Sequence, residues 1–397
     1  MAALSDLAKR GTVNNVLIFV ADSLRFDSLP SRIAQRGVTA RTVAASTYTA
    51  TSIPSMASGL YPATHRVWSF DDVLPETPEL LAGEHCGTDL RNVWDHVESP
   101  AEKPPNRILR VTEERTLEGL GEPFTLLVHD KGAHAPYDYT NVRWDTSPEF
   151  FRHFAGRDQE LRNLYQRGAT TAAERFEGLV DMLHDRELYD DTLVVFTSDH
   201  GELLGEPSRG GVYAHGAPVC PELVSVPTVF MGAGLPEGEV YDELLSGVDL
   251  APTAIAARGE TVPDDVEGVD VWTKSPSADR VVRSEFWAKG GRVSYGASSA
   301  WNRDGGVVRH HGRASERVAF AIHRKLVKGA QAPANRSRSP YQMWRLLRTF
   351  GDRELVYGSV DPQSLRPALV EEFRPNDSTS DVAAASKEQL EALGYLE

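Results

Sequence analysis

The chain has 397 residues, of which 41% are hydrophobic and 25% charged, so it can form one large or two unequal domains with a buried core. Global disorder, collagen and a small disulfide scaffold are excluded. The net charge of −15 is spread along the chain and argues against nucleic acid or anionic lipid as a partner, so an anionic substrate must meet a local positive site.

The first 15 residues and the apolar runs predict neither a secretory signal nor a membrane span. Asp6, Lys9 and Arg10 interrupt the N-terminal apolar positions, unlike a secretory signal. The longest apolar run, Val16–Ala21, is far shorter than the roughly 20 residues that span a bilayer. We therefore expect no transmembrane segment and a cytoplasmic location.

Four runs of mostly branched or aromatic residues predict strands that are buried on both faces of a mostly parallel sheet. They are Val16–Ala21, Phe124–Val128, Thr192–Thr197 and Val226–Met231. Between the second and third runs, apolar residues from Leu161 to Leu183 recur at three- and four-residue spacing and predict a long amphipathic helix. Strand, helix and strand form the crossover unit of an α/β fold, in which ligands bind beyond the carboxyl ends of the strands.

The pattern changes after about residue 275. We expect a catalytic α/β domain over residues 14–275 and a smaller C-terminal α+β subdomain over residues 276–397 that completes the fold. Ala330–Pro340 is predicted to be an exposed loop, and Lys387–Leu393 a short closing helix. Cys86 and Cys220 have no metal-binding spacing and are expected to be buried thiols.

Acidic and imidazole side chains follow the predicted strands. Asp22 follows the first strand, His129 and His134 the second, and Asp199 and His200 the third. An Asp–His pair at a strand end can bind one divalent cation, and Asp22 could supply a third ligand. The alternative is that Asp199 caps a following helix and His200 packs as a neutral side chain.

The segment Ser46–Gly59 is rich in hydroxyl groups and then becomes apolar. If a helix begins near Thr49, one hydroxyl lies at its positive end, where backbone N–H groups can hold an anion. A bound metal could activate that hydroxyl as a nucleophile. An ordinary Ser/Thr cap and turn is the alternative.

These segments resemble the sulfatase branch of the alkaline phosphatase superfamily from about residue 14 to the end. The Asp-x-x-Arg-x-Asp pattern of Asp22–Asp27 is closer to phosphonate monoester hydrolases than to the paired aspartates of most calcium sulfatases. Further motifs resemble the family, at Thr197–Glu202, Tyr213–Gly216, Val226–Pro227, Asp249–Thr253 and Leu390–Leu396. The resemblance implies an alkaline-phosphatase-like fold with a mostly parallel central sheet flanked by helices.

The nucleophile segment departs from most sulfatases. Their Cys or Ser, which is converted to formylglycine, lies ten residues before the Gly of a Gly-x-Tyr-Pro run, and that position here is Thr49, ten before Gly59. The segment resembles the unmodified threonine segment of phosphoethanolamine transferases. Oxidation of threonine gives a ketone, so we do not expect the formylglycine mechanism.

The resemblance also implies roles for further residues. The metal ligands would be Asp22, Thr49, Asp199 and His200. Thr49 would attack, and His134, His215 and Lys131 would neutralise the transferred group. Arg25 either binds an anionic oxygen or pairs with Asp27, and His129 more simply bonds a neighbouring backbone group. Ser23 stands where calcium sulfatases have a second aspartate, which favours Mn or Zn over Ca or Mg.

The sequence thus predicts a metal-dependent hydrolase or group transferase that cleaves a phosphate or sulfate ester through a threonine. Phosphoesters, including phosphodiesters, are favoured, and the substrate is a small molecule or an anionic glycan or lipid precursor. Three alternatives stay open: a sulfuric ester hydrolase without formylglycine, a transferase acting on polar glycans or lipid precursors, and a catalytically silent protein that binds an anionic ester.

Overall fold

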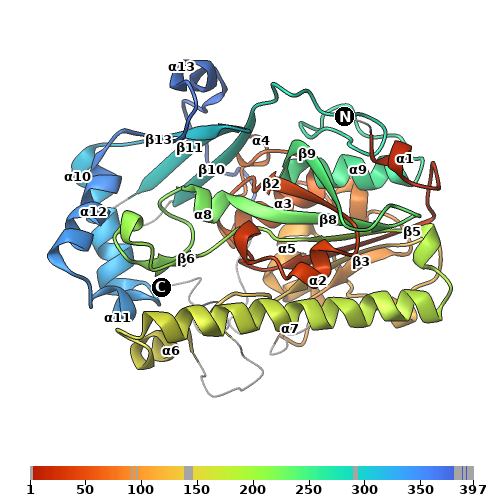
Figure 1. Cartoon of the computed structure of the whole chain (residues 1–397), viewed down its shortest axis with the longest axis horizontal. Coiled ribbons are helices and arrows are strands. Elements are labelled where there is room, and N and C mark those ends of the chain that lie inside the picture. The colour runs from red at the N-terminus through yellow and green to blue at the C-terminus, as the bar shows by residue number, and fades with distance from the viewer. Residues whose placement is uncertain are drawn as a thin grey trace.

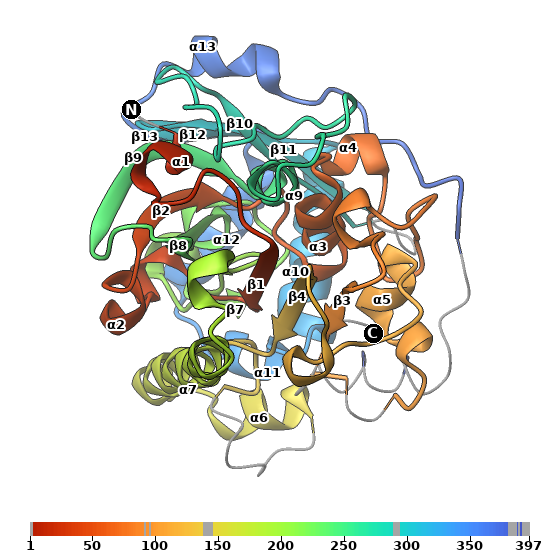
Figure 2. The same ribbon diagram turned by 90° about the vertical axis from the view of Figure 1, so that its right-hand side faces the viewer.

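The structure is a computed structural model that describes residues 3–90, 93–94, 97–137, 146–288, 294–379, 387 and 390. Within these residues, seven strands form a central sheet (Figures 1 and 2). They are β1 (Asn15–Ala21), β2 (Val38–Val43), β3 (Cys86–Asp89), β4 (Thr125–Asp130), β5 (Thr192–Thr197), β8 (Ser225–Gly232) and β9 (Glu239–Ser246). All four predicted strands are therefore present.

The spatial order of the central sheet is β3-β4-β1-β5-β8-β2-β9. β1 is parallel to both β4 and β5, and β2 is parallel to β9. In contrast, β8 is antiparallel to both of its neighbours, β5 and β2, so the sheet is mostly parallel, as predicted, with one antiparallel strand among the four predicted runs. Because β2 runs in the same direction as β1, β4 and β5, the carboxyl ends of these strands lie at one edge.

Helices cover both faces of the sheet (Figure 2). Those of the first part of the chain are α1 (Leu4–Leu7), α2 (Ser31–Ala34), α3 (Thr49–Ser58), α4 (Pro62–His65), α5 (Pro104–Leu109), α6 (Ser147–His153), α7 (Asp158–Asp185), α8 (Pro221–Val224) and α9 (Leu250–Ala257). In β1, alternate residues separate the layers: Ile18 packs in the core with α3 and α9, whereas Phe19 packs in the core with α7. The Phe19 ring lies 5.4 Å from that of Phe176 in α7, and a fully buried Phe contributes about 2 kcal/mol.

The C-terminal part adds a second sheet of four antiparallel strands in the order β10-β11-β12-β13, at the end of the molecule where β6 lies (Figure 1). Its strands are β10 (Val282–Ala288), β11 (Tyr295–Asn302), β12 (Gly305–His310) and β13 (Glu354–Gly358). Its helices are α10 (Ala314–Ile322), the π-helical turn η8 (His323–Lys328), α11 (Ala332–Asn335), α12 (Pro340–Gly351) and α13 (Pro362–Leu365). This subdomain shares one hydrophobic core with Leu203 of β6 (Leu203–Leu204) and with Val212, which precedes β7 (Tyr213–Ala214).

Two local expectations need comment. The predicted exposed loop Ala330–Pro340 is wrong, because it contains α11, and Ala330, Ala332 and Ala334 are buried. Lys387 and Leu390 of the predicted closing helix are helical, and the rest of that segment lies outside the described residues. The boundary between residues 275 and 276 stays a prediction.

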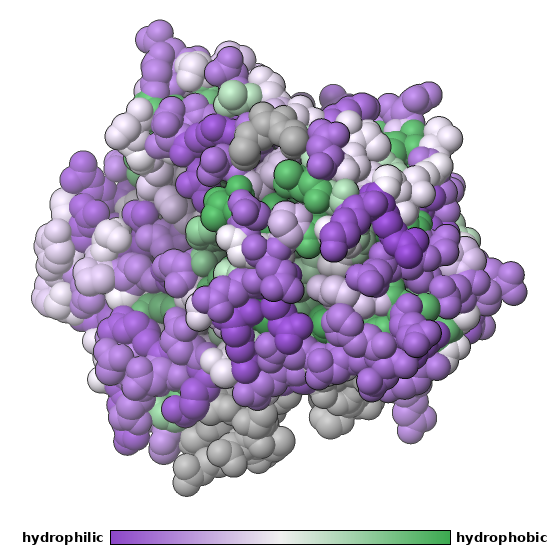
Figure 3. Space-filling model, turned by 45° about the vertical axis from the view of Figure 1, so that its right-hand side comes forward, coloured by the Kyte–Doolittle hydropathy of each residue, from purple (hydrophilic) through white to green (hydrophobic). Residues whose placement is uncertain are grey.

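The surface agrees with a highly charged protein. Most of the face shown in Figure 3 is hydrophilic, and the largest group of apolar side chains lies near its centre. None of the helices in the described ranges is long and apolar enough to cross a membrane. Cys220 is a buried free thiol as expected, whereas the free thiol Cys86 is only half-buried.

Candidate active site

Neighbouring parallel strands bring the predicted polar residues to one edge of the sheet. β1 lies between β4 and β5, and Val20 of β1 is in register with His129 on one side and Thr197 on the other. Asp22 therefore leaves β1 beside the ends of β4 and β5. Thr49 comes to the same edge from β2, as the first residue of α3. The chain runs from Asp199 and His200 into β6 rather than into a helix, so the helix-cap alternative for Asp199 is wrong.

Asp22, Asp199 and His200 form a cluster of buried metal-ligand side chains. One ligand atom from each residue lies within 4.8 Å of the other two. The His200 Nε2 atom lies 3.8 Å from Asp22 Oδ1 and 3.5 Å from Asp199 Oδ2. Mixed oxygen and nitrogen donors at this spacing suit a single divalent cation.

The hydrogen bonds of Asp199 leave one of its oxygens directed at that cluster. Its Oδ1 accepts hydrogen bonds from the backbone N–H groups of Ser23, at 3.2 Å, and His200, at 2.9 Å. Its Oδ2 is buried and has no hydrogen-bond partner among the residues that the structure describes. A buried carboxylate oxygen without a donor is costly, and a bound cation would satisfy it. The residues present therefore fit a metal ion.

The Ser23 turn connects the two carboxylates. Ser23 has a φ of 63°, in the left-handed region that a non-glycine residue rarely adopts. Its hydroxyl donates to Asp22 Oδ1 at 2.8 Å, and Tyr165 of α7 donates its own hydroxyl to the Ser23 carbonyl at 2.8 Å. The strained turn is thus held by the long helix and fixes Asp22 relative to Asp199.

His200 and Thr49 face each other. His200 Nδ1–H donates to the Gly201 carbonyl at 2.9 Å, which leaves Nε2 for the cluster. The Thr49 hydroxyl lies 3.1 Å from that Nε2. Thr49 is fully buried at the start of α3, and the side chain of the N-cap residue Tyr48 does not cap the first turn. The positive end of the helix therefore faces the threonine hydroxyl.

The carboxylates influence each other through the low-dielectric interior. Burial alone would raise the pKa of Asp22, but His134, His129 and His200 together hold that pKa well below its usual range. Burial and the neighbouring Asp22 carboxylate raise the pKa of Asp199. Repulsion between two carboxylates this close makes it unfavourable for both to be ionised, and a bound cation would offset that repulsion.

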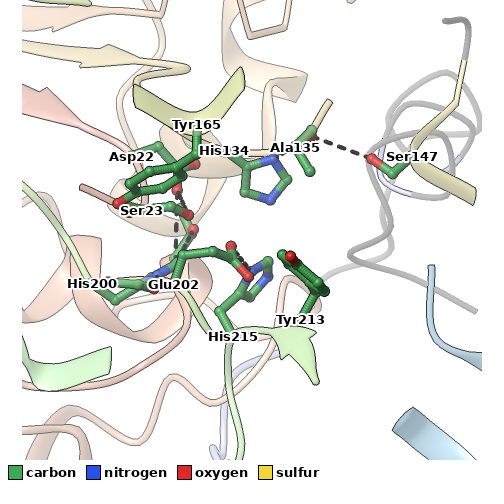
Figure 4. A network of polar contacts seen from close by, with 12 residues as sticks. Asp22, Ser23, His134, Ala135, Ser147, Tyr165, His200, Glu202, Tyr213 and His215 are labelled. Atoms are coloured by element: carbon green, nitrogen blue, oxygen red, sulfur yellow. Dashed lines mark hydrogen bonds and ion pairs between the residues drawn. The ribbon is translucent and has the colours of Figure 1, made fainter. Parts of the chain in front are cut away.

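Two histidines and a glutamate lie beside the metal-ligand cluster. Figure 4 shows the His134 ring opposite Glu202 and His215. The ring centroids of His215 lie 5.1 Å from His134 and 4.9 Å from His200. His134 Nδ1–H donates to the Ala135 carbonyl at 2.6 Å, and His215 Nδ1–H donates to Glu202 Oε2 at 3.0 Å. Both rings therefore keep Nε2 for other partners.

Burial shifts the proton affinities of this group. It lowers the pKa of His134 to about 4 and the pKa of His215 well below its ordinary value. It raises the pKa of Glu202 to about 7. At neutral pH both imidazoles are therefore uncharged, and each keeps a lone pair on Nε2.

The remaining predicted residues lie at different distances from this centre. His129 Nε2 lies 3.4 Å from Asp22 Oδ2, so this histidine faces a metal-ligand candidate rather than a backbone group. Lys131 is buried, and burial lowers its pKa to about 8. Arg25 forms ion pairs with both Asp27 and Glu206, so its guanidinium is held by two carboxylates.

Sequence reasoning gave no role to three residues that the structure places at or beside this site. Ser23 joins the carboxylates, Glu202 orients His215, and Lys325 of η8 donates to the His215 carbonyl at 3.1 Å. Glu202 stood inside the Thr197–Glu202 motif, so its position carried a signal. Lys325 lies more than 100 residues away in the chain, and nothing in its local sequence marked it.

Comparisons with known proteins show what this chain is similar to. The family model described as Sulfatase matches residues 100–259. The chain is 39% identical over 404 residues to the "Low-salt glycan biosynthesis sulfotransferase Agl7" of Haloferax volcanii, covering 99% of both chains. It is 23% identical over 150 residues to the "Uncharacterized sulfatase YdeN" of Escherichia coli, covering 37% of this chain and 26% of that protein.

Solved structures share the fold at low sequence identity. The phosphonate monoester hydrolase of Agrobacterium radiobacter superposes with a TM-score of 0.52 at 15% identity, covering 76% of this chain and 90% of that one. BT1596, a 2-O GAG sulfatase, superposes with a TM-score of 0.56 at 16% identity, covering 75% of this chain and 83% of that one. These likenesses confirm the predicted alkaline-phosphatase-like architecture.

Proposed function

Because the chain belongs to the sulfatase family of the alkaline phosphatase superfamily, we propose that it transfers a sulfuryl group from an ester to a hydroxyl group of a glycan, with Thr49 as the nucleophile. The observation that carries this proposal is the place of Thr49. Its hydroxyl is buried at the positive end of α3, 3.1 Å from His200 Nε2 and beside the cluster of Asp22 and Asp199. A hydroxyl in this position can be activated, and the charge that develops around it is stabilised.

We propose Asp22, Asp199, His200 and Thr49 as the ligands of a divalent metal ion. Two carboxylates, an imidazole and a hydroxyl suit Zn or Mn better than Ca, which prefers six or more oxygen ligands. When bound, the ion lowers the pKa of a coordinated hydroxyl and neutralises negative charge on the transferred group.

In the first half-reaction, Thr49 Oγ1 attacks the sulfur of the donor ester. The new O–S bond forms as the S–O bond to the leaving alcohol breaks, and the proton that Thr49 loses is delivered to the leaving oxygen. His215 carries that proton on Nε2, because its Nδ1–H is held by Glu202. Lys131, and His134 when it is protonated on Nε2, neutralise the sulfuryl oxygens, which is the contribution expected to dominate this kind of transfer.

The second half-reaction is the reverse with a new alcohol. A glycan hydroxyl gives its proton to His215, its oxygen attacks the sulfur, and the bond to Thr49 Oγ1 breaks as Thr49 regains a proton. If water takes the place of the glycan hydroxyl, the same steps release free sulfate. One site therefore accounts for both the hydrolase and the transferase predicted from the sequence.

The choice of a sulfate ester and a glycan acceptor is supported by the full-length similarity to a protein named as a glycan biosynthesis sulfotransferase. The preference for phosphoesters, which the Thr49 segment suggested, stays a prediction. A silent binding protein is the weakest alternative, because nothing in the cluster of Asp22, Thr49, Asp199 and His200 is missing.

The test is a panel of an aryl sulfate, an aryl phosphate monoester, a bis-aryl phosphodiester and an aryl phosphonate monoester, each with Mn, Zn, Mg or Ca. Each reaction is run with and without an oligosaccharide acceptor. Thr49→Ala is compared with Thr51→Ala, because Thr51 is equally buried in the same helix.

We expect a labelled sulfuryl group to appear on the oligosaccharide, to disappear in Thr49→Ala and to persist in Thr51→Ala. Turnover of phosphorus esters alone would instead support the phosphoester preference. If binding of an aryl sulfate survives chelation and no ester turns over with any metal, the protein is a silent binder and the proposal is wrong.

A further inference from the structure

Lys325 is a buried cation that reaches the active site from the C-terminal subdomain. Its side chain is 6% exposed, and its ammonium group donates to the backbone carbonyl of His215 at 3.1 Å. A hydrogen bond from a charged donor is about twice as strong as one between neutral groups. Lys325 lies in the π-helical turn η8, and such turns are rare and frequently found at functional sites.

Asn335 of α11 fastens this turn to the hairpin that carries His215. Its side chain is fully buried. The Asn335 amide donates to the Tyr213 carbonyl at 3.0 Å and to the Lys325 carbonyl at 3.1 Å, and its oxygen accepts from Tyr213 N–H at 2.8 Å. The Asn335 side chain thus pairs with β7 as a neighbouring strand would, and it ties Lys325 to Tyr213, which lies two residues before His215 in the chain.

The charge of Lys325 also has a buried counterpart. Residues 317–351 contain eight basic and no acidic residues, in a chain whose net charge is −15. The carboxylate of Glu202, which is buried in the central part of the fold, lies within electrostatic reach of Lys325. His215 is therefore fixed at two points, by Glu202 on its ring and by Lys325 on its backbone.

We propose that Lys325 is a positioning residue that holds His215 in register with the reacting group, so that the C-terminal subdomain completes the active site. This inference rests on the proposed function, in which His215 carries the proton between the exchanging oxygens. Loss of Lys325 would release the His215 carbonyl and leave Glu202 without its nearby cation. The ring would then lose its fixed direction, although the metal ligands would stay in place.

The kinetic test compares Lys325→Met, Lys325→Arg and Lys328→Met in the full chain with zinc. Lys328 is the matched control, because it lies in the same turn and is exposed. By analogy with residues that orient metal ligands, we expect Lys325→Met to lower kcat about 10- to 100-fold with little change in KM. Lys325→Arg should recover part of the loss, and Lys328→Met should behave as the wild type.

A double-mutant cycle with His215→Ala separates positioning from general damage. If Lys325 acts through His215, adding Lys325→Met to His215→Ala lowers kcat no further. An equal loss in both backgrounds would overturn the proposal, as would an equal loss in Lys328→Met.

A second readout does not depend on turnover. The chain has 12 histidines, and the His215→Ala spectrum identifies the His215 signals in protein labelled with ¹⁵N-histidine. We expect the wild type and Lys328→Met to show the Nδ1–H form of His215, and Lys325→Met to show a mixture of both tautomers. An unchanged His215 signal in Lys325→Met would overturn the positioning role. If no ester turns over while this signal does change, the proposed function fails and the positioning of His215 stands.

Discussion

Replacing Asp199 by Asn should stabilise the metal-free protein, although it removes a predicted metal ligand. The carboxylates of Asp22 and Asp199 are both buried, and burial together with Asp22 raises the pKa of Asp199. An Asn at this position keeps an oxygen for the N–H groups of Ser23 and His200, and its amide can donate towards Asp22. The substitution therefore replaces a like-charge contact by a hydrogen bond.

The size of the effect follows from the separation. The ligand atoms of Asp22 and Asp199 lie within 4.8 Å of each other, and two unit charges at that limit repel by about 3.5 kcal/mol at an effective dielectric constant of about 20. The neighbouring imidazoles offset part of this repulsion, so we expect a net gain of about 1 to 3 kcal/mol in the free energy of unfolding. That gain corresponds to a rise of a few degrees in the unfolding temperature.

The assay is thermal unfolding in EDTA and in zinc, with Asp190→Asn as a control at an exposed aspartate. The wild type should gain stability from zinc, and Asp199→Asn should gain little. Asp199→Asn should therefore have the higher unfolding temperature in EDTA, and the wild type should have the higher unfolding temperature in zinc. Folded Asp199 keeps its proton to higher pH than the unfolded chain does. The wild type in EDTA therefore loses stability as pH rises above about 4, and the variant lacks that loss. A variant that melts below the wild type in EDTA, or that keeps the full zinc shift, would refute this reasoning.

Further predictions concern Lys131, Glu285 and Ser23. Burial lowers the pKa of Lys131 to about 8, so KM for an anionic ester should rise as pH increases through that value, and Lys131→Arg should move the rise to higher pH. Burial raises the pKa of Glu285 from 4.5 to about 7. Its contribution of about 3 kcal/mol to the free energy of unfolding is therefore present at low pH and is lost as the pH rises to 7. Denaturant unfolding of Glu285→Gln should show a stability that depends less on pH than that of the wild type. Ser23→Ala removes the 2.8 Å hydrogen bond to Asp22, and titration with zinc should show affinity about 10-fold weaker, whereas an unchanged affinity would contradict the role of this turn.

The cluster of Asp22, Asp199 and His200 could be predicted from the sequence, because ligands bind beyond the carboxyl ends of parallel strands. Apolar runs marked β1, β4 and β5, and parallel strands carry the residues that follow them to one edge. Asp22, Asp199 and His200 follow two such runs directly, so their convergence needed no long-range information. The direction of β8 was not readable, because a strand buried on both faces has the same apolar run in either direction.

The contribution of the C-terminal subdomain to the active site could not be predicted from the sequence, for a different reason. Ala330–Pro340 has the composition of a loop, but its alanines pack in the interior and Asn335 replaces a strand partner of Tyr213. Tertiary contacts override local composition at such a place. Lys325 gave no signal either, because a lysine in a basic stretch is ordinarily solvated, and only the fold brings it to His215.

The central claim is that Thr49 carries the transferred group, and rapid quenching with a labelled aryl sulfate followed by peptide mapping tests it most directly. The account predicts one sulfuryl group on the peptide that contains Thr49, present in the wild type and in Thr51→Ala and absent in Thr49→Ala. The bound group should disappear when the oligosaccharide acceptor is added, as labelled product forms. Product formation by Thr49→Ala at the wild-type rate, or a label on any other residue, would contradict the account.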